Sequence, residues 1–147
     1  MSMAQQPARR RTAQQPAQRH EQKYFISQGD ACYLSLLLRH TMQPDRHADG
    51  RGEYHIRSLY FDDCFNSAMS DKLDGVMNRH KYRIRIYNFS DRVIRLERKS
   101  KGGEFISKMS CAISRDLAEQ IIAGDPYGLE RLNHPLLQDI YRMMTTY

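Results

Sequence analysis

Alternation of charged and apolar residues is the strongest pattern in the chain, and it is concentrated in residues 79–113. Successive side chains of a β-strand point to opposite faces, so alternation at period two predicts strands with one polar and one apolar face. Three consecutive runs carry this pattern, and a Lys-Gly-Gly turn at residues 101–103 separates the second run from the third. We therefore predict three successive strands that share one apolar surface and one charged surface.

The charged surface of the predicted strands is mainly cationic. From the three runs in turn it carries Arg79, Lys81, Arg83, Arg85 and Tyr87, then Arg95, Glu97 and Lys99, then Ile106, Lys108 and Ser110. Like charges about 4 Å apart repel by on the order of 4 kcal/mol at an effective dielectric of about 20, and by less where water and salt screen them. An ordinary solvated face mixes both signs of charge, so this pattern favours a phosphate-binding surface over a plain exposed one.

The chain changes character at residue 19. Residues 1–18 are rich in Gln, Ala, Pro and Arg and almost lack large apolar side chains, so they cannot offset the entropy of ordering. We predict a disordered tail there. Residues 19–27 then alternate, with Glu21 and Lys23 on one face, and are predicted to form the first strand of a folded domain that spans residues 19–147.

Another predicted strand covers residues 53–62, which are dense in aromatic and branched apolar side chains. Both of its faces mix polar and apolar residues, so periodicity does not decide how it is oriented. Either Ser58, Tyr60 and Asp62 share the cationic surface, or Arg57 does.

Four stretches are predicted to be helices from capping residues and apolar spacing. They are residues 30–40 capped by Asp30, residues 64–73 capped by Asp62 or Asp63, residues 115–123 capped by Ser114, and residues 134–147. The predicted buried stripes are Leu34, Leu37 and Leu38 in the first helix, and Leu136, Leu137, Ile140, Met143 and Met144 in the last. A sheet curled with its charged face inward and these helices outside gives an α+β fold, an antiparallel β tunnel with a basic interior.

The overall composition is that of a basic globular domain. The 147 residues suffice for one core, and 40% of them are hydrophobic. Lys and Arg outnumber Asp and Glu by 23 to 17, which suggests an anionic partner. We do not expect nucleic acid, because no nucleic-acid motif accompanies the charge. No apolar run approaches the roughly 20 residues of a spanning helix and no signal-peptide core is visible, so we expect a cytoplasmic chain without a membrane segment.

Five sequence features resemble a known family in their order and spacing. They are RHEQKY at residues 19–24, SLYFD at 58–62, KYRIRIYN at 81–88, IRLERKSK at 94–101, and Lys108. Together they are similar to the VTC-type polyphosphate polymerase domain, a member of the triphosphate tunnel (CYTH-like) superfamily. The resemblance implies a tunnel that takes ATP and a divalent metal, manganese or magnesium, and transfers the terminal phosphoryl group of ATP to a polyphosphate chain.

The same resemblance implies roles for individual residues. The phosphate-binding set is Lys23, Lys81, Arg83, Arg85, Lys99 and Lys108, and within it Arg83, Arg85 and Lys99 are the predicted catalytic residues. Arginine suits this role because its planar fork can meet two phosphate oxygens at once. Glu21 and Glu97 are the candidate metal ligands, although Glu97 could equally serve in a structural ion pair. Phosphoryl transfer depends mostly on positioning and charge stabilisation, so no protein nucleophile is needed.

The chain also departs from the family pattern. The family tunnel closes with further strands that bring more basic residues and the principal metal-binding glutamate, whereas residues after 114 are predicted to be helical. We therefore expect a half or incomplete barrel, which a homo-oligomer or a second chain could complete. The alternatives are a catalytically incomplete module that binds polyphosphate or triphosphate, and a tunnel triphosphatase. The triphosphatase is disfavoured, since its relatives carry several alternating glutamates on the first strand and here only Glu21 is present.

Overall fold

The computed structural model describes residues 18–146, so the predicted disordered tail lies outside the described residues except for Gln18. Within them, an antiparallel sheet has the strand order β1-β2-β3-β4. The strands are β1 (Ile56–Phe61), β2 (Arg79–Tyr87), β3 (Ser90–Gly102) and β4 (Phe105–Ile113). The sheet is open, and with its helices it forms an α+β fold with an incomplete barrel, as predicted.

The register of the strands keeps the two predicted surfaces separate. Arg83 of β2 lies opposite Glu97 of β3, and Glu97 lies opposite Ser110 of β4. On the opposite face of the sheet, Ile84 lies opposite Leu96, which is fully buried. The alternation in the sequence therefore becomes one cationic face and one apolar face, because each strand pairs in a register that matches the faces of its neighbours.

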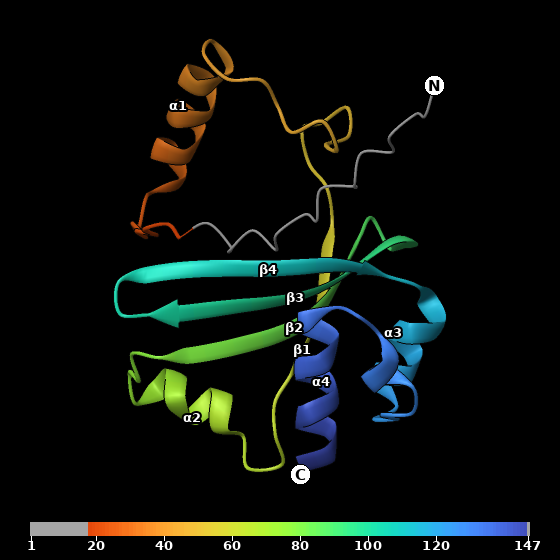
Figure 1. The fold of residues 1–147 in the computed structure, drawn as a ribbon. Helices are drawn as coiled ribbons and strands as arrows, with labels where there is room; N and C mark the ends of the chain where they lie inside the picture. The colour runs from red at the N-terminus through yellow and green to blue at the C-terminus, as the bar shows by residue number, and fades with distance from the viewer. Residues whose placement is uncertain (1–17, 147) are drawn as a thin grey trace, which may run out of the picture.

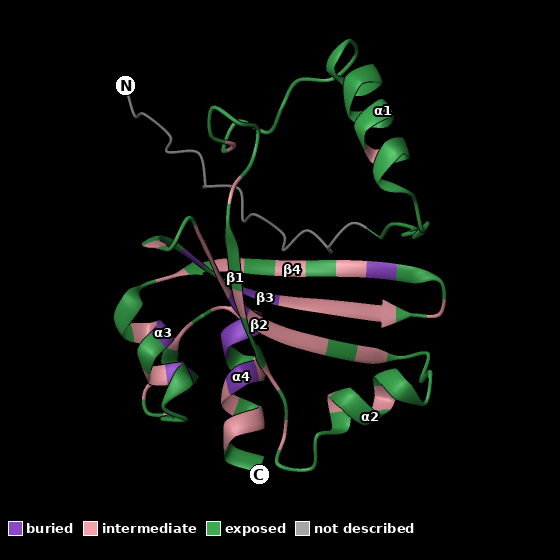
Figure 2. Cartoon of the chain, turned by 180° about the vertical axis from the view of Figure 1, so that it is seen from behind, coloured by how far each residue is buried: buried purple, intermediate pink, exposed green. Residues whose placement is uncertain are grey.

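Helices cover the apolar face. They are α2 (Ser67–Leu73), α3 (Arg115–Ile122) and α4 (Pro135–Thr146), with a short 3-10 turn η1 (Leu129–Arg131) between the last two. Figures 1 and 2 show α3 and α4 beneath the strands, and in Figure 2 the buried residues of α4 lie in the part of the helix nearest the strands. The resulting core consists of Ile84, Ile94, Leu96, Ala118, Ile121, Leu129, Leu136, Leu137 and Ile140. This confirms the predicted apolar backing and the stripe at the start of the last helix.

Capping side chains fix where the helices begin. Ser114 accepts a hydrogen bond from the backbone N–H of Leu117 and caps α3, as predicted. Asp62 and Asp63 both accept backbone N–H groups from the first turn of α2. However, α2 begins three residues later than predicted, because Asn66, in the left-handed region at φ 56°, precedes its first residue.

The structure contradicts the prediction for residues 19–27. Arg19 pairs with Ile106 at the outer edge of β4, and the rest of the stretch has no regular structure. Its large side chains find no apolar surface, since Tyr24, Phe25 and Ile26 are all more than half exposed. A strand needs a paired neighbour and a buried face, and alternation in the sequence supplies neither.

The first helix is present, but its environment differs from the prediction. In α1 (Gln28–Arg39) the N-cap is Ser27, and Asp30 closes a capping box three residues later. The predicted buried stripe is wrong: Leu34, Leu37 and Leu38 are 43, 47 and 49% exposed. Figure 1 shows α1 standing apart from the sheet, so its amphipathic spacing has nothing to pack against among the described residues. No helix within residues 18–146 has the length and apolar character needed to cross a membrane.

Candidate anion-binding face

Three lysines lie side by side on the sheet face that the helices leave uncovered. Lys81 of β2 is directly opposite Lys99 of β3, and Lys99 is directly opposite Lys108 of β4. We call this set the lysine row. Side chains opposite each other in an antiparallel pair have Cβ atoms about 4.5–5.5 Å apart, so like charges at these positions destabilise the sheet. An anion across the row would relieve that repulsion.

The next cross-strand row is built around Arg83. Its Nε and Nη2 atoms each lie 2.7 Å from Oε2 of Glu97, and its Nη1 donates to the hydroxyl of Tyr60 at 2.9 Å. The guanidinium carbon is also 5.7 Å from the centre of the Tyr60 ring. Arg83 therefore bridges β1 and β3 from its place on β2.

Arg85 occupies the following row. Its Nε donates to Ser58 Oγ at 3.2 Å and lies 4.0 Å from Oε2 of Glu97. These contacts settle the orientation of β1, since Ser58 and Tyr60 share the cationic face and Arg57 does not. Arg57 instead places its guanidinium 5.2 Å from the centre of the Phe89 ring. Sequence alone left the choice between these two orientations open, because it follows from the pairing of β1 with β2.

Glu97 lies at the centre of these cations. It is 2% exposed, and within residues 18–146 it is the one polar or charged residue that is buried. Lys108 Nζ is 2.5 Å from its Oε1, whereas Arg83 and Arg85 approach Oε2. Burial opposes ionisation of Glu97, but hydrogen bonds from Lys108 and Arg83 outweigh burial and lower its pKa. Glu97 is therefore a carboxylate at neutral pH.

The segment before α1 brings one more carboxylate to the face. Glu21 Oε2 lies 2.7 Å from Lys99 Nζ, and the hydrogen bond from Lys99 lowers the pKa of Glu21. Lys23 does not join the lysine row: its amine lies 3.9 Å from Glu21, and its side chain is 85% exposed. Of the predicted phosphate-binding residues, the sheet thus brings together Lys81, Arg83, Arg85, Lys99 and Lys108.

A protein-family comparison agrees with this arrangement. The family model of the VTC domain matches residues 18–147, which is most of the chain. The chain belongs to the VTC domain family. A comparison with curated proteins found none that matches. VTC domains have a tunnel-metalloenzyme-like fold and are associated with polyphosphate polymerase activity.

Lys81 is the member of the lysine row without a carboxylate partner among the described residues. Burial lowers the pKa of its amine, and repulsion from Lys72, Arg79 and Lys99 adds to that effect. A group whose charge is disfavoured in this way is stabilised by any anion that binds next to it. An anion bound beside Lys81 of this VTC domain would therefore favour the charged form of its amine.

The two predicted metal ligands of the VTC domain are not placed to hold a metal. No group of three His, Cys, Asp or Glu side chains suited to a metal occurs within residues 18–146. Both oxygens of Glu97 face cations, and Glu21 is paired with Lys99. A divalent ion would have to displace lysine or arginine from these oxygens against their charge, so the residues present do not fit it.

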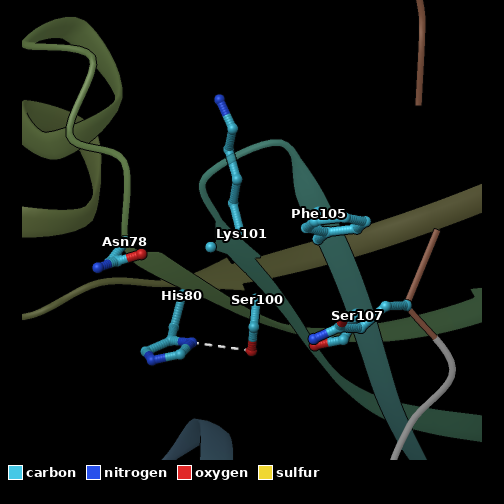
Figure 3. A pocket seen from close by; sticks show the side chains of 8 residues that line it. Asn78, His80, Ser100, Lys101, Phe105 and Ser107 are labelled. Atoms are coloured by element: carbon cyan, nitrogen blue, oxygen red, sulfur yellow. Dashed lines mark hydrogen bonds between the residues drawn. The ribbon is translucent and has the colours of Figure 1, made fainter. Parts of the chain in front are cut away.

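A separate hollow of about 300 Å³ lies beside the start of β2 and the β3–β4 turn. Figure 3 shows the pair within it: His80 Nδ1 and Ser100 Oγ are 2.8 Å apart, and the side chain of Lys101 points away from them. His80 and Ser100 are directly opposite residues of β2 and β3 on the face turned toward the helices. No carboxylate lines the hollow to orient His80, so this is a cross-strand hydrogen bond and not an activated nucleophile.

Proposed function

We propose that this VTC domain binds the triphosphate of ATP and polyphosphate on its cationic face, and that it acts in transferring the terminal phosphoryl group of ATP to a polyphosphate chain. The observation that carries the proposal is the convergence of Lys81, Arg83, Arg85, Lys99 and Lys108 on one open sheet face. The five side chains come from three adjacent strands, so their positive charge extends across the sheet and is not confined to one strand.

The contacts of the arginines support this role. A guanidinium has five N–H donors, and Arg83 uses three of them on Glu97 and Tyr60, which leaves two for a ligand. Arg85 uses Nε on Ser58, so both of its terminal nitrogens keep their donors. Donors held in place in this way can bind phosphate oxygens and stabilise charge that develops during transfer, with little reorganisation.

A second candidate function is binding of polyphosphate without transfer. It is favoured by the pairing of Glu21 and Glu97 with cations, which leaves the described residues without a metal site. Both candidates require the same anion-binding face and differ in turnover. Polyphosphate formation from ATP with manganese, measured on the purified chain, separates them.

The binding itself is tested by thermal unfolding with tripolyphosphate. A ligand that binds only the folded state raises the melting temperature, and the double variant Arg83→Ala/Arg85→Ala should lose that rise. The matched control is Arg57→Ala/Arg92→Ala. This variant removes the same charge at positions outside the lysine row and away from Arg83 and Arg85, and it should keep the rise in melting temperature. An undiminished rise in the Arg83/Arg85 variant would contradict the proposal.

A further inference from the structure

The two carboxylates on the cationic face, those of Glu21 and Glu97, differ in burial and in the number of cations that they contact. Glu21 comes from an irregular segment, has a 28% exposed side chain and pairs closely with Lys99 alone. Glu97 is 2% exposed, belongs to the central region of the sheet and has Arg83 and Lys108 at 2.7 and 2.5 Å. A buried charge with such neighbours is part of how the site is built, since removing it would leave cations close together without compensation.

The two carboxylate oxygens of Glu97 contact different cations. Oε1 holds the amine of Lys108 from β4, and Oε2 holds the guanidinium of Arg83 from β2. Both partners belong to the proposed phosphate-binding set, and each keeps N–H donors that Glu97 does not use. The carboxylate therefore fixes where those donors lie before any ligand arrives.

We propose that Glu97 is a positioning residue, which holds Arg83 and Lys108 in their phosphate-binding arrangement, and that it does not act as a metal ligand. The inference rests on the proposed phosphate binding. It predicts that neutralising Glu97 weakens anion binding, which is the opposite of what the loss of its negative charge alone would do. Removing a negative charge beside an anion site should tighten anion binding by Coulomb attraction, whereas loss of a positioning group should weaken it.

The first test is tripolyphosphate binding by calorimetry, with EDTA present so that no metal contributes. We expect Glu97→Gln to weaken binding by at least roughly fivefold, because Arg83 and Lys108 must then be ordered by the ligand itself. Glu104→Gln removes the same charge from an exposed position in the β3–β4 turn and should leave the affinity unchanged. Unchanged or tighter binding by folded Glu97→Gln would overturn the inference.

Urea unfolding keeps the inference testable if Glu97→Gln is poorly folded. Glu97→Gln and Lys108→Met should each lower the urea midpoint, and the double variant should lose less than the sum, because the two residues are in contact. Strictly additive losses would overturn the inference. If the wild type binds no tripolyphosphate, the proposed function fails, and the unfolding measurements still decide whether Glu97 organises these cations.

Nuclear magnetic resonance of the wild type separates positioning from metal binding directly. The Arg83 Nε–H signal, assigned by its absence in Arg83→Lys, should be protected from exchange because it donates to Glu97. Millimolar magnesium should leave the signal unchanged. Disappearance of the signal on adding magnesium would mean that the metal takes Glu97 from Arg83, and it would overturn the inference.

Discussion

At the scale of a single residue, Lys81 shows that the cationic face is not arranged for the greatest stability of the free protein. Burial and neighbouring cations lower the pKa of its amine, and no carboxylate within residues 18–146 pairs with it. A charge held where the fold disfavours it is typical of a binding site, because the ligand supplies the missing partner.

Lys81→Met should therefore stabilise the free protein and weaken the bound state. We expect the free energy of unfolding in urea to rise by about 0.5 kcal/mol, which is the scale of a like-charge cross-strand pair. The melting-temperature rise with tripolyphosphate should shrink in the same variant. Arg92→Met serves as the control for loss of one positive charge outside the lysine row, and it should change neither quantity.

Glu97 makes a pH prediction with a definite sign. Hydrogen bonds lower its pKa below the ordinary value of 4.5 despite its burial, so the unfolded state takes up its proton first as the pH falls. The stability that Glu97 contributes should be fully present above about pH 4.5 and lost as the pH falls through the lowered pKa. Urea midpoints between neutral and acid pH should therefore fall more steeply in the wild type than in Glu97→Gln.

The same residue marks the limit of sequence reasoning at this scale. A glutamate among lysines and arginines is equally consistent with a metal ligand and with a counterion, and both readings of Glu97 were open. The distances favour the counterion, since Arg83 lies close to Oε2 of Glu97 and Lys108 lies close to Oε1. The family resemblance implies that Lys23 binds phosphate, yet in the irregular segment before α1 its side chain is 85% exposed.

At the scale of elements, alternation predicts the strands correctly where the apolar face of a strand packs against helices and its edges pair with other strands. The prediction holds for strands β2, β3 and β4 and for the covering helices α3 and α4. In these strands the apolar residues at alternate positions face the core, and burial of these residues fixes the strand register. Residues 19–27 and the leucines of α1 have the right spacing but no packing surface among the described residues. The spacing of apolar residues predicts an amphipathic element, and tertiary contacts decide whether its apolar face is buried.

Strand β2 allows the two faces to be tested against each other. Ile84 is 6% exposed in the core, so Ile84→Asp places an unpaired charge there and should abolish cooperative unfolding measured by circular dichroism. Arg85→Ala, one position away on the cationic face, should leave the fold intact. If Arg85→Ala unfolds the protein and Ile84→Asp does not, the assignment of the faces is wrong.

At the scale of the whole molecule, the sheet presents its cationic face without a covering helix, and the net charge of the chain is +6. The expectation that another chain completes the tunnel stays a prediction. An open cationic face should attract anions over a distance set by the Debye screening length. That length falls from about 10 Å at 0.1 M salt to about 3 Å at 1 M.

Tripolyphosphate affinity should therefore fall steeply with salt. We expect a loss on the order of tenfold or more between 0.1 and 1 M sodium chloride in calorimetric titrations, because the contacts are mainly ionic and partly exposed. The Arg57→Ala/Arg92→Ala variant should show the same dependence, since its changes lie outside the cationic rows. Constant affinity over this range would mean that the ligand binds somewhere other than this face.

The side chain of Arg83 also has a dynamic consequence. From the middle of three strands it contacts Tyr60 on one neighbour and Glu97 on the other, so it ties the outer strand β1 to β3 independently of the backbone ladder. Edge strands open more readily than central ones, and their amides exchange faster with deuterated solvent. A phosphate chain that immobilises Arg83 should accordingly slow amide exchange in β1, although Arg83 itself belongs to β2.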